Sequence, residues 1–309
     1  MFVKRFCLAH MSVFFLLACP VFAVQSAPQL RYFMQPEAVR GSETPYGVNS
    51  AVGRYVLADD ARIYYEVYGE GRPFFVFHGG GVGSPYELGK IIDELRKEFL
   101  VVVVSTRGHG RSEIGHKPLS YAQKADDMLA VMREMTAHPA PVLGFSDGAY
   151  AAYKLAAMYP EAVERIVAIG AGTLRSGYFA PEVRVTDIEK MDRAYIAQVR
   201  RIMPEPERLE DFFADYMKFW SAMHVGKEVF GAIACPVLLL SGDEDDHAPV
   251  SSVVEAHQMI PNSRLCIVPK AGHAAFLDNH PVAWTAIEQF VRAESPASAK
   301  KLKQNDSRH

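Results

Sequence analysis

The chain has 309 residues, a formal net charge of −3, and a composition of 49% hydrophobic and 22% charged residues. That length allows one large domain or two small ones with a sizeable core. The small net charge provides no basic surface of the kind that binds nucleic acid, and the acidic residues are not gathered into an interaction tail.

The N-terminus has the pattern of a secretory signal peptide, which we place at residues 1–23. Lys4 and Arg5 precede an apolar run that ends near residue 18, and a small residue, Ala23, closes the segment. The run is shorter than the roughly 20 residues that a membrane-spanning helix needs, although an uncleaved anchor stays open. We expect a secreted or periplasmic protein. Alternatively, a lipid on Cys19 would anchor it to the cell envelope, and only then would the membrane be a partner.

Strands and helices alternate along most of the remaining chain. Residues 24–52 have no clear period and are interpreted as an N-terminal extension or linker, and two strand-like runs, 53–57 and 62–67, then form a hairpin. Continuous apolar runs follow, and helical stretches separate most of them; such runs indicate strands buried on both faces. They lie at residues 74–77, 101–104, 141–145, 165–169, 237–240 and 265–268. The sequence therefore predicts an α/β domain over residues 53–293 with a mostly parallel sheet.

The alternation is interrupted over about residues 173–232. Apolar side chains recur there at helical spacing from Leu209 to Met223, with a second helix expected around residues 187–201. We interpret this insertion as a helical cap over the strand ends. The polar residues 294–309 are interpreted as a disordered tail.

Residues 144–148 read Gly-Phe-Ser-Asp-Gly and lie between a predicted buried strand and a predicted helix. The pattern G-x-S-x-G at such a junction is a nucleophile elbow, in which small residues allow strand and helix to approach while the serine occupies a strained turn. Ser146 is the candidate nucleophile.

A serine hydroxyl needs a base to remove its proton and a carboxylate to orient that base. His273 follows the last predicted strand and is the one histidine in a suitable place. The loop after the preceding strand, residues 241–249, offers several carboxylates, with Asp245 as the candidate and Asp243 and Asp246 as alternatives. The same loop contains His247, but its residues are too crowded in sequence for a metal cage, and no metal is expected.

Residues 78–81 read His-Gly-Gly-Gly after another buried strand. Glycines there can turn backbone N–H groups toward a developing oxyanion, which needs two donors. We assign these donors to Gly80 and Asp147. A phosphate-binding loop is the alternative, but the Lys-Ser/Thr of a Walker loop and the spacing of a dinucleotide fingerprint are missing from this segment.

In order along the chain, these motifs resemble the α/β-hydrolase family, and the Ser-Asp-Gly elbow with a short cap resembles its valacyclovir-hydrolase-like branch. The family spacing of Gly242 to Pro249 selects Asp245 as the acid. The segment Arg-Gly-His-Gly-Arg-Ser at residues 107–112 also matches, except that Ser105 stands where the family often has Asp. The resemblance implies an α/β-hydrolase fold and hydrolysis of esters or related acyl compounds without a cofactor.

The expected function is therefore acyl transfer to water by a serine hydrolase acting on a small molecule. Carbon–carbon bond hydrolysis, perhydrolysis or substrate binding without turnover are alternatives on the same residues. For substrate binding we expect Asp147, Phe145 and Trp220 to contribute. Asp147 is either a local helix cap or a carboxylate that attracts a cationic group of the substrate, such as the amine of an amino-acid ester.

Two cysteines, Cys235 and Cys266, remain after the predicted cleavage. Export would permit a disulfide, but the two residues lie at different heights on neighbouring predicted strands, roughly 10 Å apart along them. We expect two thiols, with a disulfide as the alternative.

Overall fold

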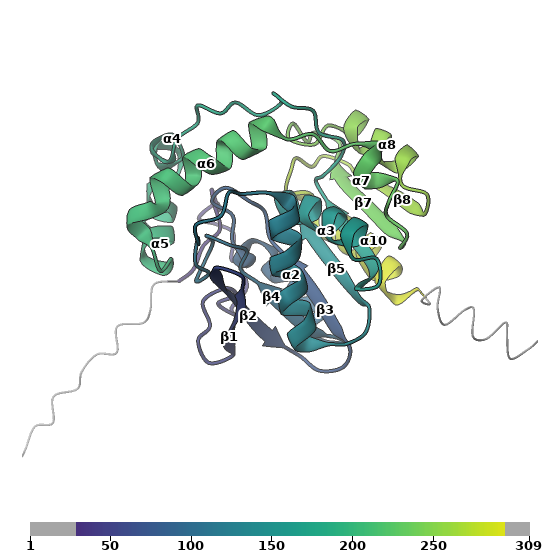
Figure 1. Cartoon of the computed structure of the whole chain (residues 1–309), viewed down its shortest axis with the longest axis horizontal. Coiled ribbons are helices and arrows are strands. Elements are labelled where there is room, and N and C mark those ends of the chain that lie inside the picture. Colours follow the sequence, from purple (N-terminus) through teal and green to yellow (C-terminus); the bar gives the residue numbers. More distant parts are fainter. Residues whose placement is uncertain (1–28, 294–309) are drawn as a thin grey trace, which may run out of the picture.

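The computed structural model describes residues 29–293, and its centre is one eight-stranded sheet (Figure 1). The strands are β1 (Gly53–Ala58), β2 (Ala61–Tyr68), β3 (Pro73–Phe77), β4 (Leu100–Val104), β5 (Ala140–Phe145), β6 (Val163–Ile169), β7 (Val237–Gly242) and β8 (Ser263–Val268). Their order across the sheet is β1-β2-β4-β3-β5-β6-β7-β8. The pairs β1–β2 and β2–β4 are antiparallel, and all other neighbours are parallel. The predicted α/β fold with a mostly parallel sheet is confirmed.

Helices cover both faces of the sheet, which explains why the central strands are apolar throughout rather than alternating. One face packs against α2 (Tyr121–Met135), α3 (Asp147–Met158), α7 (Lys227–Phe230) and α8 (Val250–Met259). The other packs against α1 (Gly89–Leu95), α9 (Ala275–Asp278) and α10 (His280–Arg292). Strands β3 and β4 each bury four consecutive residues between these two layers.

Two helices begin just after a serine, and one of these serines caps its helix with its side chain. Ser84 and Pro85 begin a short 3₁₀ helix, η1 (Pro85–Leu88), which leads into α1, and the Ser84 side chain makes no capping hydrogen bond. Ser120 does cap α2, because its hydroxyl accepts a hydrogen bond from the Gln123 backbone N–H at 3.1 Å. The Gln123 side chain instead donates to Asp127 at 3.0 Å, so only half of a capping box forms.

Three helices of the insertion form a layer above the sheet (Figure 1). They are α4 (Val185–Met191), α5 (Arg193–Ile202) and, after the 3₁₀ turn η2 (Pro206–Arg208), α6 (Leu209–Ala222). The apolar stripe of α6 packs with α4 and α5 in a cluster of its own, which also takes in Val82 and Ile114 from loops of the sheet domain. The cap therefore rests directly on loops that follow the central strands.

The segment at residues 29–52 contains no regular strand or helix but is packed rather than free. Buried Tyr46 donates a hydrogen bond to Asp93 of α1 at 2.7 Å. The Gly47 and Asn49 backbone N–H groups donate to the buried Glu66 of β2 at 2.7 and 2.5 Å. These contacts make the segment a docked extension and not a linker.

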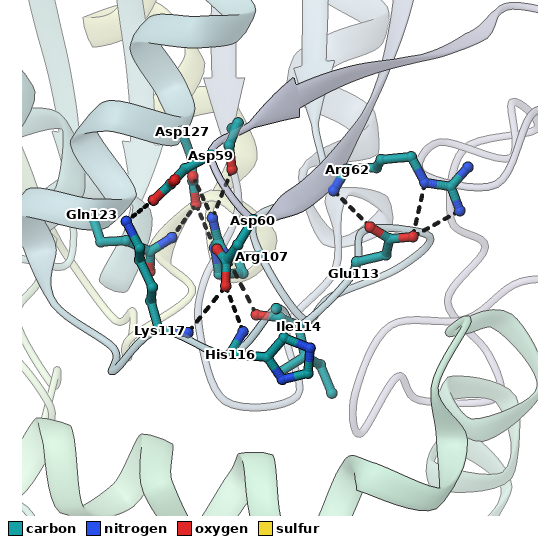
Figure 2. Close-up of polar contacts among 12 residues, drawn as sticks. Asp59, Asp60, Arg62, Arg107, Glu113, Ile114, His116, Lys117, Gln123 and Asp127 are labelled. Atoms are coloured by element: carbon teal, nitrogen blue, oxygen red, sulfur yellow. Dashed lines mark hydrogen bonds and ion pairs between the residues drawn. The ribbon is translucent and has the colours of Figure 1, made fainter.

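A buried arginine holds together the loop after β4 (Figure 2). The Arg107 guanidinium donates two hydrogen bonds to Asp127 of α2, at 2.9 and 2.8 Å, and one to Asp60 at 2.5 Å. A further bond, of 3.0 Å, goes to the Ala58 carbonyl. Arg107 thus links the β1–β2 hairpin and α2 to the loop after β4, whose Ile114 contacts the cap.

Both cysteines in the described part of the chain, Cys235 and Cys266, are free thiols. Burial raises the pKa of Cys235 to about 12, which makes it unreactive at neutral pH. Between residues 29 and 293, none of the helices has the length and apolarity that crossing a membrane requires. The predicted signal peptide, with Cys19, and the predicted tail lie outside the described residues.

Candidate active site

Ser146 lies at a strained turn between β5 and α3. Its backbone has φ 51° and ψ −118°, outside the regions that L-residues favour. Small neighbours permit this turn: a Cβ on Gly144 would lie 2.4 Å from the Gly148 carbonyl oxygen, and a Cβ on Gly148 would lie 2.5 Å from the His78 carbonyl oxygen. The Ser146 N–H donates to the Ile169 carbonyl at 2.7 Å, which fixes the turn against β6.

The structure brings Ser146, His273 and Asp245 into one hydrogen-bonded relay. The His273 Nε2 lies 2.9 Å from the Ser146 hydroxyl, and its Nδ1 lies 3.0 Å from each carboxylate oxygen of Asp245. The three residues follow β5, β8 and β7, whose carboxyl ends meet at the same edge of the parallel sheet. Because Asp245 only accepts, Nδ1 carries the proton and Nε2 accepts the hydrogen bond from the serine hydroxyl.

Asp245 is held in a dense set of donors. Its side chain is fully buried and also accepts hydrogen bonds from the His247 and Ala248 backbone N–H groups, both at 2.9 Å. Burial raises the pKa of a carboxyl group, but the bond from His273 and these two amides outweigh it and hold the pKa of Asp245 below its ordinary value. The carboxylate is therefore ionised at neutral pH.

The alternative acids point elsewhere. Asp243 accepts a hydrogen bond from the Ala271 backbone N–H at 3.2 Å, and Asp246 contacts the His247 ring at 2.7 Å. Both aspartates are exposed, and neither contacts His273.

His247 stacks on His273, with ring centroids 4.6 Å apart and an interplanar angle of 25°. Asp245, His247 and His273 each have a potential metal-ligand atom within 4.8 Å of the others. However, imidazole lone pairs lie in the ring planes, so two nearly parallel stacked rings do not point their nitrogens at one ion. The Asp245 oxygens are also occupied by His273. The cluster fits a stacked support for His273 better than a metal site.

The two backbone amides predicted to be oxyanion donors are those of Gly80 and Asp147. Gly80 lies in the loop after β3, and Asp147 is the first residue of α3. Within residues 29–293, neither backbone N–H donates a hydrogen bond to another backbone group. A hydrogen bond next to Gly80 holds this loop in place, because the Gly79 N–H donates to Glu87 at 2.8 Å.

The Asp147 side chain is not available to a substrate cation, and it accepts no hydrogen bond from the first backbone N–H groups of α3, so both of our expectations for it were wrong. The Lys124 ammonium pairs with its carboxylate, and both side chains are only 1% exposed. Hydrogen bonds from Tyr216 at 2.7 Å, Trp220 at 3.0 Å and Tyr121 at 3.1 Å complete its surroundings. Asp147 therefore joins α2, α3 and the cap helix α6 rather than lining a pocket.

The pKa values of this pair follow from burial and mutual attraction. Burial raises the pKa of a carboxyl group, but the Lys124 charge opposes it and holds the pKa of Asp147 below its ordinary value. Burial also lowers the pKa of Lys124, while the Asp147 charge opposes that shift. The arrangement is an ion pair that stabilises the charge of each partner.

The other two expected binding residues have different surroundings. The Phe145 ring is buried and packs between His273, at 5.0 Å between centroids, and Phe276, at 4.9 Å. The observed role of Phe145 is to pack against the base, His273. Trp220 is partly buried, and its ring lies 5.4 Å from Phe179 and against Gly80, where an added Cβ would be 2.6 Å from it.

The residues that sequence reasoning missed are Lys124, Tyr121, Tyr216, Glu87 and the stacked His247. One signal for Lys124 was available: Tyr121, Ala125 and Met128 define the buried face of α2, and Lys124 occupies that same face. A lysine on the apolar face of a helix indicates a buried partner.

Comparison with known proteins agrees with this geometry. Residues 74–287 match the model of the alpha/beta hydrolase family. The chain belongs to this family. Among curated relatives, it is 24% identical to the human serine hydrolase BPHL over 245 residues, covering 72% of this chain and 81% of BPHL.

Solved structures show the same fold. The meta-cleavage product hydrolase CumD of Pseudomonas fluorescens superposes with a TM-score of 0.65 at 21% identity, covering 80% of this chain and 100% of CumD. The esterase RhEst1 of a Rhodococcus species superposes with a TM-score of 0.63 at 20% identity, covering 78% of this chain and 99% of RhEst1. At these identities the structures support the fold alone.

Proposed function

We propose that this protein is a serine hydrolase that cleaves an ester or related acyl bond of a small molecule through an acyl-enzyme intermediate. The observation that carries the proposal is the continuous relay from the Ser146 hydroxyl through His273 to the buried Asp245, with contacts of 2.9 and 3.0 Å. The similarity to a serine hydrolase, BPHL, supports it.

In the proposed mechanism, His273 Nε2 takes the hydroxyl proton of Ser146 as its oxygen attacks the substrate carbonyl. Asp245 stabilises the imidazolium that forms and keeps the Nδ1 proton in place. The Gly80 and Asp147 amides donate to the tetrahedral oxyanion. His273 then protonates the leaving group, and the tetrahedral intermediate collapses to the acyl-serine. Water, deprotonated by the same nitrogen, releases the acid and restores the serine.

A substrate panel tests the reaction class. The purified protein is assayed against aryl esters of graded acyl length, against amino-acid esters and against 1,3-diketones, with Ser146→Ala as the matched control. The proposal predicts turnover of esters that falls by roughly three to six orders of magnitude in the variant. Turnover of the diketones alone would favour carbon–carbon bond hydrolysis, which the name of CumD suggests for that protein. Specific binding of compounds from the panel without turnover of any would favour a non-catalytic binding protein.

We also propose that the protein is exported. This proposal rests on the basic residues, short apolar run and small-residue cleavage site of residues 1–23. The intact mass of material from the periplasm or medium tests it: a mature chain beginning at Val24 is expected. A lipid-modified Cys19 would identify an envelope lipoprotein instead.

A further inference from the structure

An ion pair is buried directly beside the proposed nucleophile, and its purpose is not explained by the relay. Lys124 comes from α2 and Asp147 from the start of α3, and each side chain is 1% exposed. Placing two charges in a protein interior costs free energy that their attraction often only balances. The cost of burying both charges therefore calls for a reason beyond the stability of the fold.

The position of Asp147 supplies one. Its backbone N–H is a proposed oxyanion donor, so its carboxylate belongs to the residue that must stabilise a developing negative charge. Without a counter-charge, the carboxylate of this residue would repel the oxyanion. In a buried site such repulsion is weakly screened. Lys124 offsets this repulsion because its ammonium group forms an ion pair with the same carboxylate.

Lys124 also contacts the cap. Its ammonium hydrogen-bonds the Tyr216 hydroxyl and lies 4.3 Å from the centre of the Tyr216 ring. Tyr216 in turn lies against the oxyanion loop: a Cβ on Gly80 would be 2.6 Å from the Tyr216 hydroxyl and equally close to the Trp220 ring. Through this contact, the cluster around Lys124 packs helix α6 against the loop that contains Gly80, the other proposed oxyanion donor.

We propose that Lys124 is a positioning residue for acyl transfer, which neutralises Asp147 beside the oxyanion and holds the cap helix against Gly80. The inference rests on the proposed serine-hydrolase function. It assigns a role in turnover to a residue that contacts neither the substrate nor the relay.

The role predicts that removing Lys124 alone lowers turnover more than removing both charges of the pair. Lys124→Met leaves a buried negative charge next to the oxyanion and should lower kcat for p-nitrophenyl acetate by roughly 10- to 100-fold, with KM changed by less than about 3-fold. Adding Asp147→Asn to Lys124→Met removes the stranded charge and should raise kcat about 3-fold or more above that of Lys124→Met, while staying below wild type because the contact with Tyr216 is still missing. The matched control is Lys97→Met, since Lys97 is an exposed lysine on a remote surface, paired with Glu94.

Thermal unfolding of every variant is measured beside the kinetics. If Lys124→Met does not fold, Lys124→Gln, which keeps a hydrogen-bond donor without the charge, carries the same comparison. A wild-type kcat in the folded single variant would overturn the proposal. So would a double variant as slow as Lys124→Met, because both variants lack the contact with the cap and differ in the stranded charge, which would then have no effect on turnover. Absence of ester turnover and of covalent labelling in the wild-type protein would instead overturn the proposed function itself.

Discussion

Replacing Asp245 by asparagine tests the relay at its most enclosed point. One carboxylate oxygen accepts from the backbone amides of His247 and Ala248, each at 2.9 Å, and both oxygens lie 3.0 Å from His273 Nδ1. An asparagine must keep its carbonyl oxygen toward the two amides. Its NH₂ group then faces Nδ1, which can only accept that bond by giving up its proton. The proton moves to Nε2, where it blocks the nitrogen that should deprotonate Ser146.

The expected loss in kcat for Asp245→Asn is about 10⁴-fold, equivalent to about 5 kcal/mol of transition-state stabilisation. Initial rates with an activated aryl ester at pH 7 to 8 give the value, and circular dichroism checks that the variant is folded. The matched control is Asp243→Asn, two residues away on the same loop, where the exposed carboxylate has only the Ala271 amide at 3.2 Å. The control should stay within about 3-fold of wild type. A control more damaged than Asp245→Asn would refute the reasoning.

Three further predictions concern ionisable groups that are buried or partly buried. Since Lys124 already pairs with Asp147, esters with and without an amine should have kcat/KM values within about 3-fold of each other in a matched pair; a tenfold preference for the amine would contradict this. Burial raises the pKa of Glu87 to about 8, so the folded state retains a proton that the unfolded chain loses, and stability falls as pH rises from about 4.5 to 8. Glu87→Gln should therefore gain thermal stability over wild type at pH 9 but not at pH 5, and equal gains at both would contradict the assignment. Arg107→Met leaves the buried Asp127 without its partner and should lower the free energy of unfolding by about 3–5 kcal/mol in a denaturant titration, whereas a loss under 1 kcal/mol would contradict it.

The sequence predicted the sheet and the relay well because both depend on local patterns. Continuous apolar runs mark strands that helices cover on both faces, and the G-x-S-x-G spacing marks a turn that only small flanking residues permit. His273 could be placed because it follows a strand at this edge of the sheet, whereas Asp245 was chosen among the acids of its loop by the family spacing of Gly242 to Pro249. These are properties of short segments, which a reader of the sequence can see directly.

The contacts of Asp147 could not be predicted in the same way. Its partners come from two distant segments, Lys124 on α2 and both Tyr216 and Trp220 on α6, and only the fold brings the cap helix against α2 and α3. From sequence, a carboxylate after the nucleophile looked available to a substrate amine. In the structure, the Lys124 ammonium occupies the position expected for the substrate amine. This pairing depends on packing between segments that are distant in the sequence.

The packed segment at residues 29–52 illustrates the same limit. Its composition lacks a period, which suggested an extension or linker. One of its contacts with the sheet domain is with the buried carboxylate of Glu66, which accepts two of its backbone N–H groups. No pattern within the segment indicates that acceptor.

The most direct test of the central claim is covalent labelling with a fluorophosphonate, which reacts with serine hydroxyls activated by a neighbouring base. The labelled protein is digested, and the modified peptide is identified by mass spectrometry. The account predicts one adduct, on Ser146, with ester hydrolysis lost in proportion to labelling and no adduct in His273→Ala. An unlabelled Ser146 in a protein that still hydrolyses esters, or an adduct on another serine, would contradict it.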